Sequence, residues 1–231
     1  MNQKESNFGK WYPRWTIFHS LVCIAGLVIA LKYSFEEYWL FTIGMSMSWF
    51  VYSFCIPTYA NAVTIGRLIS ILILTFFYSD LSSNILLLGF TIAISLDGVD
   101  GFLARKLRQT TQSGGALDME TDSILVMLLT WIHYTEGKIE WYFLIPATLR
   151  YSYELGFFWL RKYDTDLPTK RVRATIAVVY FISLLLPFLD MSGIDHFVLS
   201  LASILIIFSF GISIVSRLHS LLKKKDLNFF N

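Results

Sequence analysis

Residues 97–122 read DGVDGFLARKLRQTTQSGGALDMETD, where acidic side chains interrupt two neighbouring hydrophobic segments. Four of these side chains are aspartates: Asp97, Asp100, Asp118 and Asp122. Carboxylates are rare and costly within a bilayer, so a cluster of them there indicates a functional site. Four anions near lipid need protons or cations to neutralise them, and hard divalent cations are the natural partners of oxygen ligands. The stretch therefore predicts a metal site at the edge of a membrane.

The first part of this stretch forms one stripe if it is helical. Positions i, i+3, i+4, i+7 and i+8 share a face of an α-helix. From residue 97 onward these positions hold Asp97, Asp100, Gly101, Ala104 and Arg105. Small residues let a ligand or a partner helix approach the backbone closely. The stripe therefore combines two carboxylates and a cation with room for a ligand.

The second pair of aspartates lies on the next helix. Asp118 and Asp122 are four residues apart and so share a face. Gly114 and Gly115 open this helix, and the connection over residues 108–113 is short and polar. We expect the two pairs to face each other across a narrow gap. That geometry suits one or two Mg²⁺ or Mn²⁺ ions held by carboxylates and by substrate phosphates.

Ion pairing with an arginine is the alternative explanation for an intramembrane aspartate. Arg67, Arg105 and Arg150 are available for such a pair. One arginine accounts for one aspartate, whereas four aspartates in register repel one another unless further cations are present. The pattern therefore favours a metal site over simple ion pairing.

The composition of the chain indicates a membrane protein. Its 231 residues are 55% hydrophobic and only 16% charged, whereas soluble domains have roughly 25% charged residues. Apolar stretches long enough to cross a hydrocarbon core of about 30 Å recur along the whole chain. We therefore expect an all-α, polytopic transmembrane helical bundle. The eight apolar segments cover residues 16–31, 39–57, 61–79, 84–105, 116–135, 139–160, 170–189 and 196–216.

Basic residues predict the orientation of these segments. With eight spans and a cytoplasmic N-terminus, most Lys and Arg residues fall on the cytoplasmic side and most loop acids on the other. An odd number of spans would destroy this asymmetry. We therefore expect an integral, multi-pass protein of a bacterial inner or plasma membrane, with both termini and the aspartates toward the cytoplasm. The cytoplasmic set is Lys4, Lys10, Arg14, Arg105, Lys106, Arg108, Arg161, Lys162, Lys170, Arg171, Arg173, Arg217, Lys223, Lys224 and Lys225.

The first two apolar segments contain no charged residue and lack the polar positions that occur in later segments. We interpret residues 1–57 as an interfacial segment with two additional transmembrane helices. Residues 58–231 then form a six-helix catalytic domain with a basic C-terminal tail. Cys23 and Cys55 fall within apolar stretches, so we expect them to be buried and unpaired. No nucleic-acid partner is expected.

The spacing D-x2-D-G-x2-A-R-x8-G-x3-D-x3-D is complete over residues 97–122. It resembles the motif of the CDP-alcohol phosphotransferases, integral-membrane enzymes of phospholipid synthesis. The six-helix arrangement from about residue 61 to residue 225 also resembles the core of that family. The resemblance implies transfer of a phosphatidyl group from a CDP-activated lipid such as CDP-diacylglycerol to a small alcohol, with release of CMP. It also implies a membrane-lipid environment and association as a homodimer.

The same resemblance implies a role for each motif position. Asp97, Asp100 and Asp118 would ligate metal. Asp122 would be the general base, and would also add to the ligands of a second ion. Residues implied for the CDP-lipid site, with the arginine on a phosphate, are Asn61, Thr64, Gly101, Ala104, Arg105, Thr111 and Gly114. Asn61 and Thr64 also fit a purely structural role as helix caps.

The alcohol acceptor is less constrained by the sequence. Arg150 lies within a predicted span, and Lys170, Arg171 and Arg173 crowd the start of the next. Together they fit charge-assisted binding of a phosphorylated acceptor such as glycerol 3-phosphate. The three residues at 170–173 equally fit an anchor against anionic lipid, and Arg150 equally fits an ion pair with Glu154, four residues away.

The residue after the fourth aspartate departs from the family pattern. Many members that use phosphorylated acceptors have a basic residue there, but this chain has Ser123, so serine, inositol and other alcohols remain open. Two other classes fit an intramembrane acidic cluster. A transporter would use it as a proton or cation relay, but that leaves the Gly, Ala and Arg stripe unexplained. An aspartate-rich prenyltransferase would use a diphosphate donor, but those enzymes usually have denser aspartate motifs on more distant helices.

Overall fold

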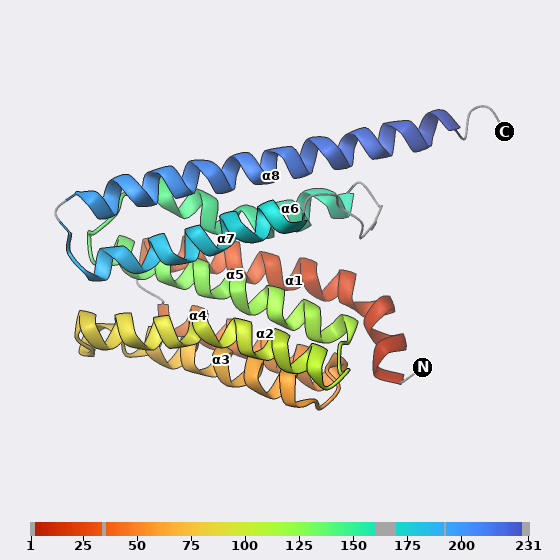
Figure 1. Ribbon diagram of the computed structural model, residues 1–231, viewed down its shortest axis with the longest axis horizontal. Helices are drawn as coiled ribbons and strands as arrows, with labels where there is room; N and C mark the ends of the chain where they lie inside the picture. Colours follow the sequence, from red (N-terminus) through yellow and green to blue (C-terminus); the bar gives the residue numbers. More distant parts are fainter. Residues whose placement is uncertain (1–2, 34–35, 160–169, 192, 228–231) are drawn as a thin grey trace.

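Long helices lie side by side along the length of the molecule (Figure 1). The structure is a computed structural model that describes residues 3–33, 36–159, 170–191 and 193–227. Each predicted apolar segment coincides largely with one α-helix, and the described residues contain no β-strand, which confirms the all-α prediction for them. These helices are α1 (Gln3–Tyr33), α2 (Glu36–Phe54), α3 (Tyr59–Phe76), α4 (Ser83–Lys106), α5 (Gln112–Thr135), α6 (Leu144–Trp159), α7 (Lys170–Leu185) and α8 (Ile194–Leu227). Short 3-10 turns lie at η1 (Tyr78–Asp80), η2 (Trp141–Phe143) and η3 (Leu186–Phe188).

The prediction for the first helix was wrong about its start. α1 begins at Gln3 rather than at residue 16, and it runs through Pro13. Aromatic packing explains the extension, because Phe8 stacks on Tyr12 with ring centroids 4.5 Å apart and meets α2 edge-on. Lys4 Nζ also donates hydrogen bonds to two carbonyls at the C-terminal end of α2, which have no partner within that helix. The last helix, α8, continues to Leu227 and so includes the basic residues of the predicted C-terminal tail.

The additional helical pair formed by α1 and α2 depends on one close approach. A Cβ atom at Gly26 of α1 would lie 2.1 Å from the ring of Trp39 in α2. Any side chain at this position would therefore push the two helices apart. Cys23 and Cys55 are both buried and free, as predicted.

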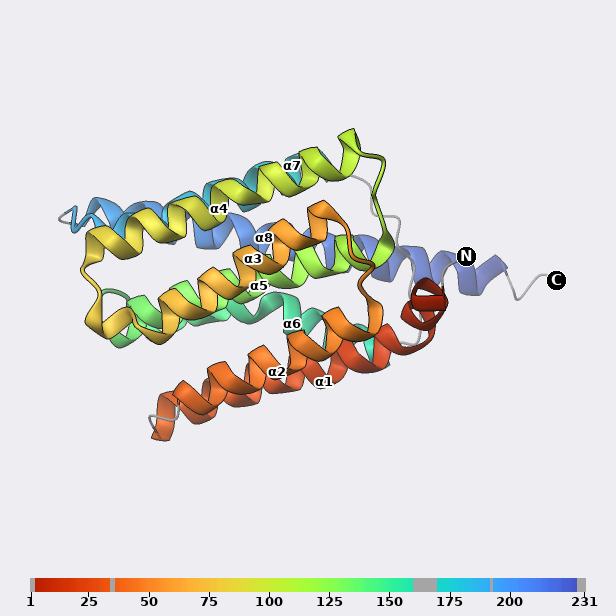
Figure 2. The same cartoon turned by 90° about the horizontal axis from the view of Figure 1, so that it is seen from below.

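Helix α5 lies at the centre of the bundle. It packs on α3, α6 and α7 and also contacts α1, and most of the side chains in its C-terminal half are buried. Figure 2 shows the α1–α2 pair on one side of the bundle and α4 with α7 on the other, with α3 and α5 between them. The functional segment on α5 is therefore enclosed by helices on several sides.

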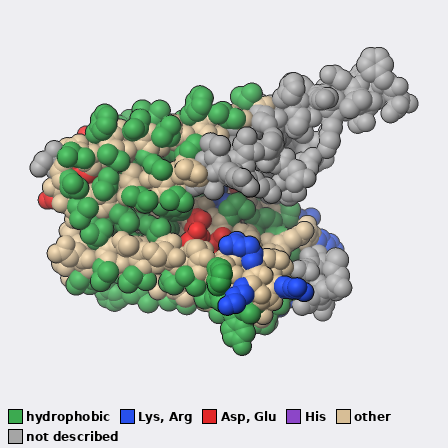
Figure 3. All heavy atoms as spheres, viewed as in Figure 1, with side chains coloured by type: hydrophobic (Ala, Val, Ile, Leu, Met, Phe, Trp, Pro, Cys, Tyr) green, Lys and Arg blue, Asp and Glu red, His purple; other side chains and the backbone are tan. Residues whose placement is uncertain are grey.

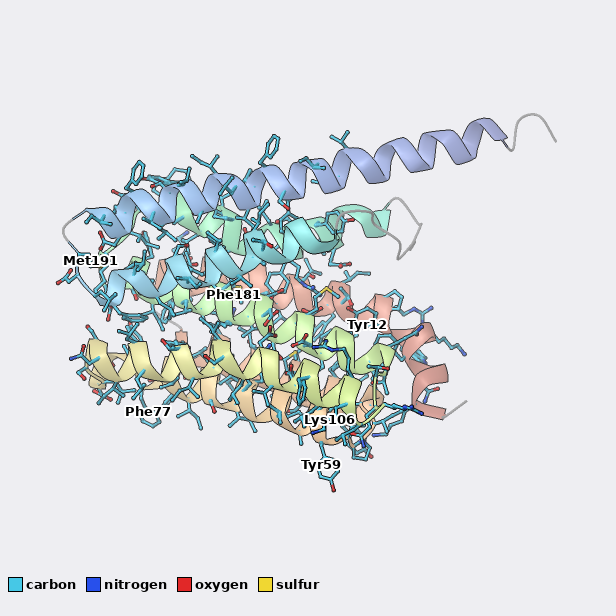
Figure 4. The ribbon with its side chains drawn as sticks, viewed as in Figure 1. Tyr12, Tyr59, Phe77, Lys106, Phe181 and Met191 are labelled. Carbon is cyan, nitrogen blue, oxygen red and sulfur yellow. The ribbon has the colours of Figure 1, made fainter. Side chains whose placement is uncertain are left out.

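Both ends of the chain lie at one end of the bundle, together with the α4–α5 connection (Figure 1). Figure 4 labels Lys106 and Tyr59 at this end and Met191 at the opposite end. The aspartates of α4 and α5 lie in the half of the bundle nearer to this end.

In the part of the chain that the structure describes, four helical segments are long and apolar enough to cross a membrane: Asn7–Tyr33, Tyr59–Phe76, Ser83–Lys106 and Ile194–Ile212. Only 22–39% of the residues in the most apolar part of each segment are buried inside the protein. Many of their large hydrophobic side chains therefore face outward. Figure 3 shows these side chains covering most of the visible face. An apolar surface of this extent suits lipid rather than water. The chain is therefore an integral membrane protein.

Candidate active site

The aspartates of α4 and α5 converge, as the sequence predicted. One carboxylate oxygen from each of Asp97, Asp100 and Asp118 lies within 4.8 Å of the others. The Asp100 side chain is 4% exposed, whereas those of Asp97, Asp118 and Asp122 are 44%, 41% and 30% exposed. Figure 3 shows acidic side chains in a hollow of this face, with Lys and Arg side chains gathered beside them. The cluster is therefore closed to solvent at Asp100 and open to solvent at the other three aspartates.

Arg67 of α3 lies in the middle of the cluster. Its Nη1 donates a hydrogen bond of 2.6 Å to Asp97 Oδ1 and lies 3.8 Å from Asp100 Oδ2. Its Nη2 donates to Asp118 Oδ1 at 3.1 Å and to Asp122 Oδ1 at 2.6 Å. The Arg67 side chain is fully buried. A single guanidinium thus joins all four carboxylates.

The charge of the cluster is not balanced by this arginine. Four carboxylates and one guanidinium leave a formal charge of −4 + 1 = −3, and among the described residues Arg67 is the cation that pairs with them. Surplus charge in a poorly solvated site needs a counter-ion or protons. A divalent cation would supply that counter-charge, so the charge of the site fits a bound metal ion.

The hydrogen bonds also leave oxygen atoms for such an ion. Arg67 binds Oδ1 of Asp97, Asp118 and Asp122. Arg67 donates no hydrogen bond to the second oxygen, Oδ2, of these three side chains. Carboxylates that ligate metals are commonly held in this way by outer partners. The all-oxygen donor set is the type that Mg²⁺ and Mn²⁺ prefer.

Sequence reasoning named Arg67 as a candidate ion-pair partner and placed it on the same helix face as Thr64, but did not assign it to the site. The available signal was its spacing from Thr64, three residues earlier on the same face of α3. Thr64 Oγ1 donates a hydrogen bond of 2.7 Å to Asp100 Oδ2. Helix α3 thus contributes two donors to the aspartate cluster.

The predicted stripe is present on α4. The Arg105 guanidinium lies against Gly101. A Cβ atom at that glycine would be only 3.4 Å from Arg105 Nη1, so the missing side chain of Gly101 makes room for the guanidinium. Ala104 is half-buried and Arg105 is exposed. The small residues therefore leave a cation close to the carboxylates and accessible to a ligand.

The remaining predicted nucleotide residues gather where α3 and α5 begin. Thr111 caps α5, its hydroxyl accepting a hydrogen bond of 3.0 Å from the Gly114 amide. A Cβ atom at Gly114 would lie 2.6 Å from Asn61 Oδ1 and 2.8 Å from Thr111 Oγ1. Gly114 is therefore required for this close approach. The cap of α3 is Thr58, which accepts from the Asn61 amide at 3.1 Å, so neither Asn61 nor Thr64 is that cap.

Arg150 does not join the aspartates among the described contacts. It forms an ion pair with Glu120 of α5, a residue to which sequence reasoning assigned no role. The side chains of Lys170, Arg171 and Arg173 lie outside the part of the chain that the structure describes. The hydroxyl of Ser123, the residue after the fourth aspartate, donates to the Met119 carbonyl at 2.8 Å.

Comparison with known proteins assigns the chain to a family. The sequence model of the CDP-alcohol phosphatidyltransferase family matches residues 57–215, which include the four aspartates and Arg67. A relative named CDP-diacylglycerol–glycerol-3-phosphate 3-phosphatidyltransferase, from Salmonella choleraesuis (strain SC-B67), is 30% identical over 128 residues. That alignment covers 54% of this chain and 66% of the relative. The relative of the same name from Escherichia coli (strain K12) is 33% identical over 89 residues, 38% of this chain and 47% of the relative.

The chain thus spans about half to two thirds of the length of these curated relatives. No solved structure matches it. The family match, in contrast, covers well over half of the chain and the whole aspartate cluster. This chain therefore belongs to the CDP-alcohol phosphatidyltransferase family.

Proposed function

We propose that this protein transfers a phosphatidyl group from CDP-diacylglycerol, or a closely similar CDP-activated lipid, to an alcohol and releases CMP. The observation that carries the proposal is the convergence of Asp97, Asp100 and Asp118 oxygens within 4.8 Å. An exposed arginine beside this cluster, Arg105, supplies charge for a phosphate. The family supports this type of reaction, and the names of the relatives support glycerol 3-phosphate as the acceptor.

We propose Mg²⁺ or Mn²⁺ as the cofactor, one or two ions per chain. Asp97, Asp100 and Asp118 would hold the first ion, and Asp122 would add to the ligands of a second. When bound, such ions offset the negative charge that develops on the diphosphate and on the departing CMP. The surplus charge of the cluster and its unengaged carboxylate oxygens support this assignment.

Asp122 is the proposed general base. Arg67 holds one of its oxygens, and the other is left for the hydroxyl group of the acceptor. Asp122 takes the hydroxyl proton as the acceptor oxygen forms a bond to the phosphorus that carries diacylglycerol. The bond from this phosphorus to the CMP oxygen breaks, and its electron pair leaves with CMP.

The nucleotide end of the donor would lie along the stripe of α4. Arg105 would bind a phosphate, while Gly101 and Ala104 would let the nucleotide approach the helix. Asn61, Thr64, Thr111 and Gly114 would line the neighbouring part of the site, where the N-terminal end of α5 also favours negative charge. Basic side chains at Lys170, Arg171 and Arg173 remain the proposed contacts for a phosphorylated acceptor, whereas Arg150, which was also predicted for this role, forms an ion pair with Glu120.

We propose that all eight helices cross the membrane, in a bacterial inner or plasma membrane, with both termini in the cytoplasm. Residues 1–57 would be an additional unit on a catalytic domain over residues 58–231. The gathering of both termini and the α4–α5 connection at one end supports this topology. Single cysteines at Gln109 and Asn84, introduced into a variant without Cys23 and Cys55, test it. Only the cysteine at position 109 should react with a membrane-impermeant reagent from the cytoplasmic side.

The reaction is tested by CMP release from CDP-diacylglycerol by the purified protein. The assay should contain Mg²⁺ or Mn²⁺ and should compare glycerol 3-phosphate, serine and inositol derivatives as acceptors. We expect CMP release with glycerol 3-phosphate. Release with a different single acceptor would replace the acceptor but retain the reaction. Absence of CMP release with every acceptor, together with cation uptake into proteoliposomes, would contradict the proposal and favour a transporter.

A further inference from the structure

Helix α5 carries a buried acid between two of its aspartates. Glu120 is two residues from Asp118 and two from Asp122, so its side chain leaves the opposite face of the helix. It is 1% exposed and forms an ion pair with Arg150 of α6, which is 13% exposed. Taking two charges out of water is expensive. The placement of such a pair directly behind the aspartates therefore calls for a role.

His19 of α1 lies on the other side of the glutamate. Its Nε2 is 4.0 Å from Glu120 Oε2, the oxygen that Arg150 does not bind. Its Nδ1 is 3.0 Å from Ser46 Oγ of α2. The ring of Trp15 stacks on the imidazole with centroids 4.7 Å apart and planes 10° apart, and Trp15 Nε1 donates to the Ser46 carbonyl at 3.2 Å. The histidine is thus fixed in place.

These contacts connect four helices. They run from Ser46 on α2 through His19 on α1 and Glu120 on α5 to Arg150 on α6. Helices α1 and α2 lie outside residues 57–215, the part of the chain that the family model matches. The additional helical pair therefore reaches the functional helix itself.

Small rotations of α5 would matter at the aspartate cluster. A side-chain end lies roughly 5–6 Å from the axis of an α-helix. A rotation of about 10° would therefore move the carboxylates of Asp118 and Asp122 by about 1 Å, more than the roughly 0.5 Å that a functional site tolerates. Apolar contacts alone specify rotation weakly, whereas a single buried polar pair is known to fix register.

We propose that Glu120 and Arg150 form a positioning pair that sets the rotation of α5 and so aims Asp118 and Asp122 at the bound ion. His19 and Ser46 close this pair from outside, which makes the α1–α2 pair part of the catalytic unit. The inference rests on the proposed function, because the carboxylates that it positions are the proposed metal ligands and base. It also gives Arg150 a role through Glu120 instead of a contact with the acceptor.

The test compares E120Q, R150M and the double variant E120Q/R150M with the unaltered protein. The matched control is E136Q, which removes the ion pair between Glu136 and Lys138 at the far end of α5. For each purified full-length protein, three quantities are measured: Mn²⁺ affinity by electron paramagnetic resonance, the thermal unfolding temperature, and kcat and KM for the acceptor.

Each single variant should weaken Mn²⁺ binding roughly 10- to 100-fold. It should lower kcat by a similar factor and leave the KM for the acceptor within about twofold of its original value. The double variant should recover the unfolding temperature, because it contains no lone buried charge, but it should not recover Mn²⁺ affinity. H19A should weaken Mn²⁺ binding in the same direction by a smaller factor, and E136Q should change none of the three quantities.

Recovery of both stability and Mn²⁺ affinity in the double variant would overturn the inference, because the pair would then be only structural. An increased acceptor KM in R150M with unchanged Mn²⁺ affinity would also overturn it, since Arg150 would then contact the acceptor. If the single variants do not fold, E120D retains the charge on a shorter side chain. It should bind Mn²⁺ roughly tenfold more weakly at a nearly unchanged unfolding temperature, and unchanged affinity there contradicts the inference. Absence of Mn²⁺ binding by the unaltered protein would instead remove the proposed metal centre, and this inference with it.

Discussion

Two buried arginines contact α5 from opposite sides, and their surroundings differ. Arg67 meets four carboxylates, three of them 30–44% exposed. Arg150 forms an ion pair with Glu120, which is almost completely buried. The Arg67 side therefore has surplus negative charge and is partly open to solvent, whereas the ion pair on the Arg150 side is largely buried.

This difference distinguishes the aspartate cluster, where a ligand binds, from the Glu120–Arg150 pair, which holds helices in place. Surplus charge is tolerable only where solvent, protons or a bound cation can offset it, so it marks the place where a ligand enters. A matched and buried pair has no such need, and its best-attested use is to specify one arrangement of helices. The two faces of α5 thus predict different responses to substitution and to metal.

The largest expected effect is at the open face. Asp122→Asn should reduce turnover by roughly 100- to 10,000-fold, the range typical of a lost general base. Nucleotide binding should survive, because three carboxylates and Arg105 remain. Turnover is measured as CMP release and binding by titration with a CDP analogue. Turnover close to that of the unaltered protein would remove Asp122 from this role.

The two arginines should respond differently to metal. Arg67→Met leaves four carboxylates without a buried counter-charge, and breaking a buried ion pair costs about 3–5 kcal/mol. Saturating Mn²⁺ should restore much of this stability, because the ion offsets the same carboxylates. Mn²⁺ should not restore the stability of the Arg150→Met variant, because the lost charge faced Glu120 and the weaker Mn²⁺ binding expected of this variant reduces the stabilisation that the ion provides. Unfolding curves in detergent, with and without Mn²⁺, measure both variants, and an equal response to Mn²⁺ would erase the distinction between the two faces.

Removal of metal from the unaltered protein is a milder perturbation. An ion present at one hundred times its dissociation constant stabilises the folded state by about 2.7 kcal/mol. A chelator should therefore lower the unfolding temperature and abolish CMP release, and added Mn²⁺ or Mg²⁺ should reverse both changes. The variant with Asn at positions 97, 100 and 118 provides the control, because its unfolding temperature should no longer depend on the chelator.

The smallest expected effect is at the nucleotide end of the open face. Gly114→Ala introduces a Cβ atom 2.6 Å from Asn61 Oδ1, and overpacking of this kind typically costs about 1–3 kcal/mol. We expect a higher KM for CDP-diacylglycerol with a smaller change in kcat. Gly115→Ala is the matched control, since nothing lies within 4 Å of a Cβ atom at that position. If both variants behave alike, the contact between Gly114 and Asn61 has no role in donor binding.

The features that sequence reasoning predicted correctly depend on local periodicity. The spacing of Asp97 and Asp100, and that of Asp118 and Asp122, fixes which residues share a helix face. The short connection between α4 and α5 then makes the two faces meet. These rules need no knowledge of the other helices, which is why the convergence of Asp97, Asp100 and Asp118 was predictable.

The features that it missed depend on packing between distant helices. The position of Arg67 among the carboxylates requires α3 to lie against both α4 and α5. The pair between Glu120 and Arg150 requires the rotation of α5 relative to α6, whereas the sequence offered only the local partner Glu154. The early start of α1 depends on contacts of Phe8 with α2. In each case the deciding partner is remote in sequence, so periodicity within one segment does not identify that partner.

Anomalous diffraction from crystals grown with Mn²⁺ tests the central claim most directly. We predict an anomalous difference peak between α4 and α5, with oxygen atoms of Asp97, Asp100 and Asp118 about 2.1 Å from it. A crystal of active protein with ordered Mn²⁺ elsewhere, and with Arg67 alone between these three carboxylates, would contradict it.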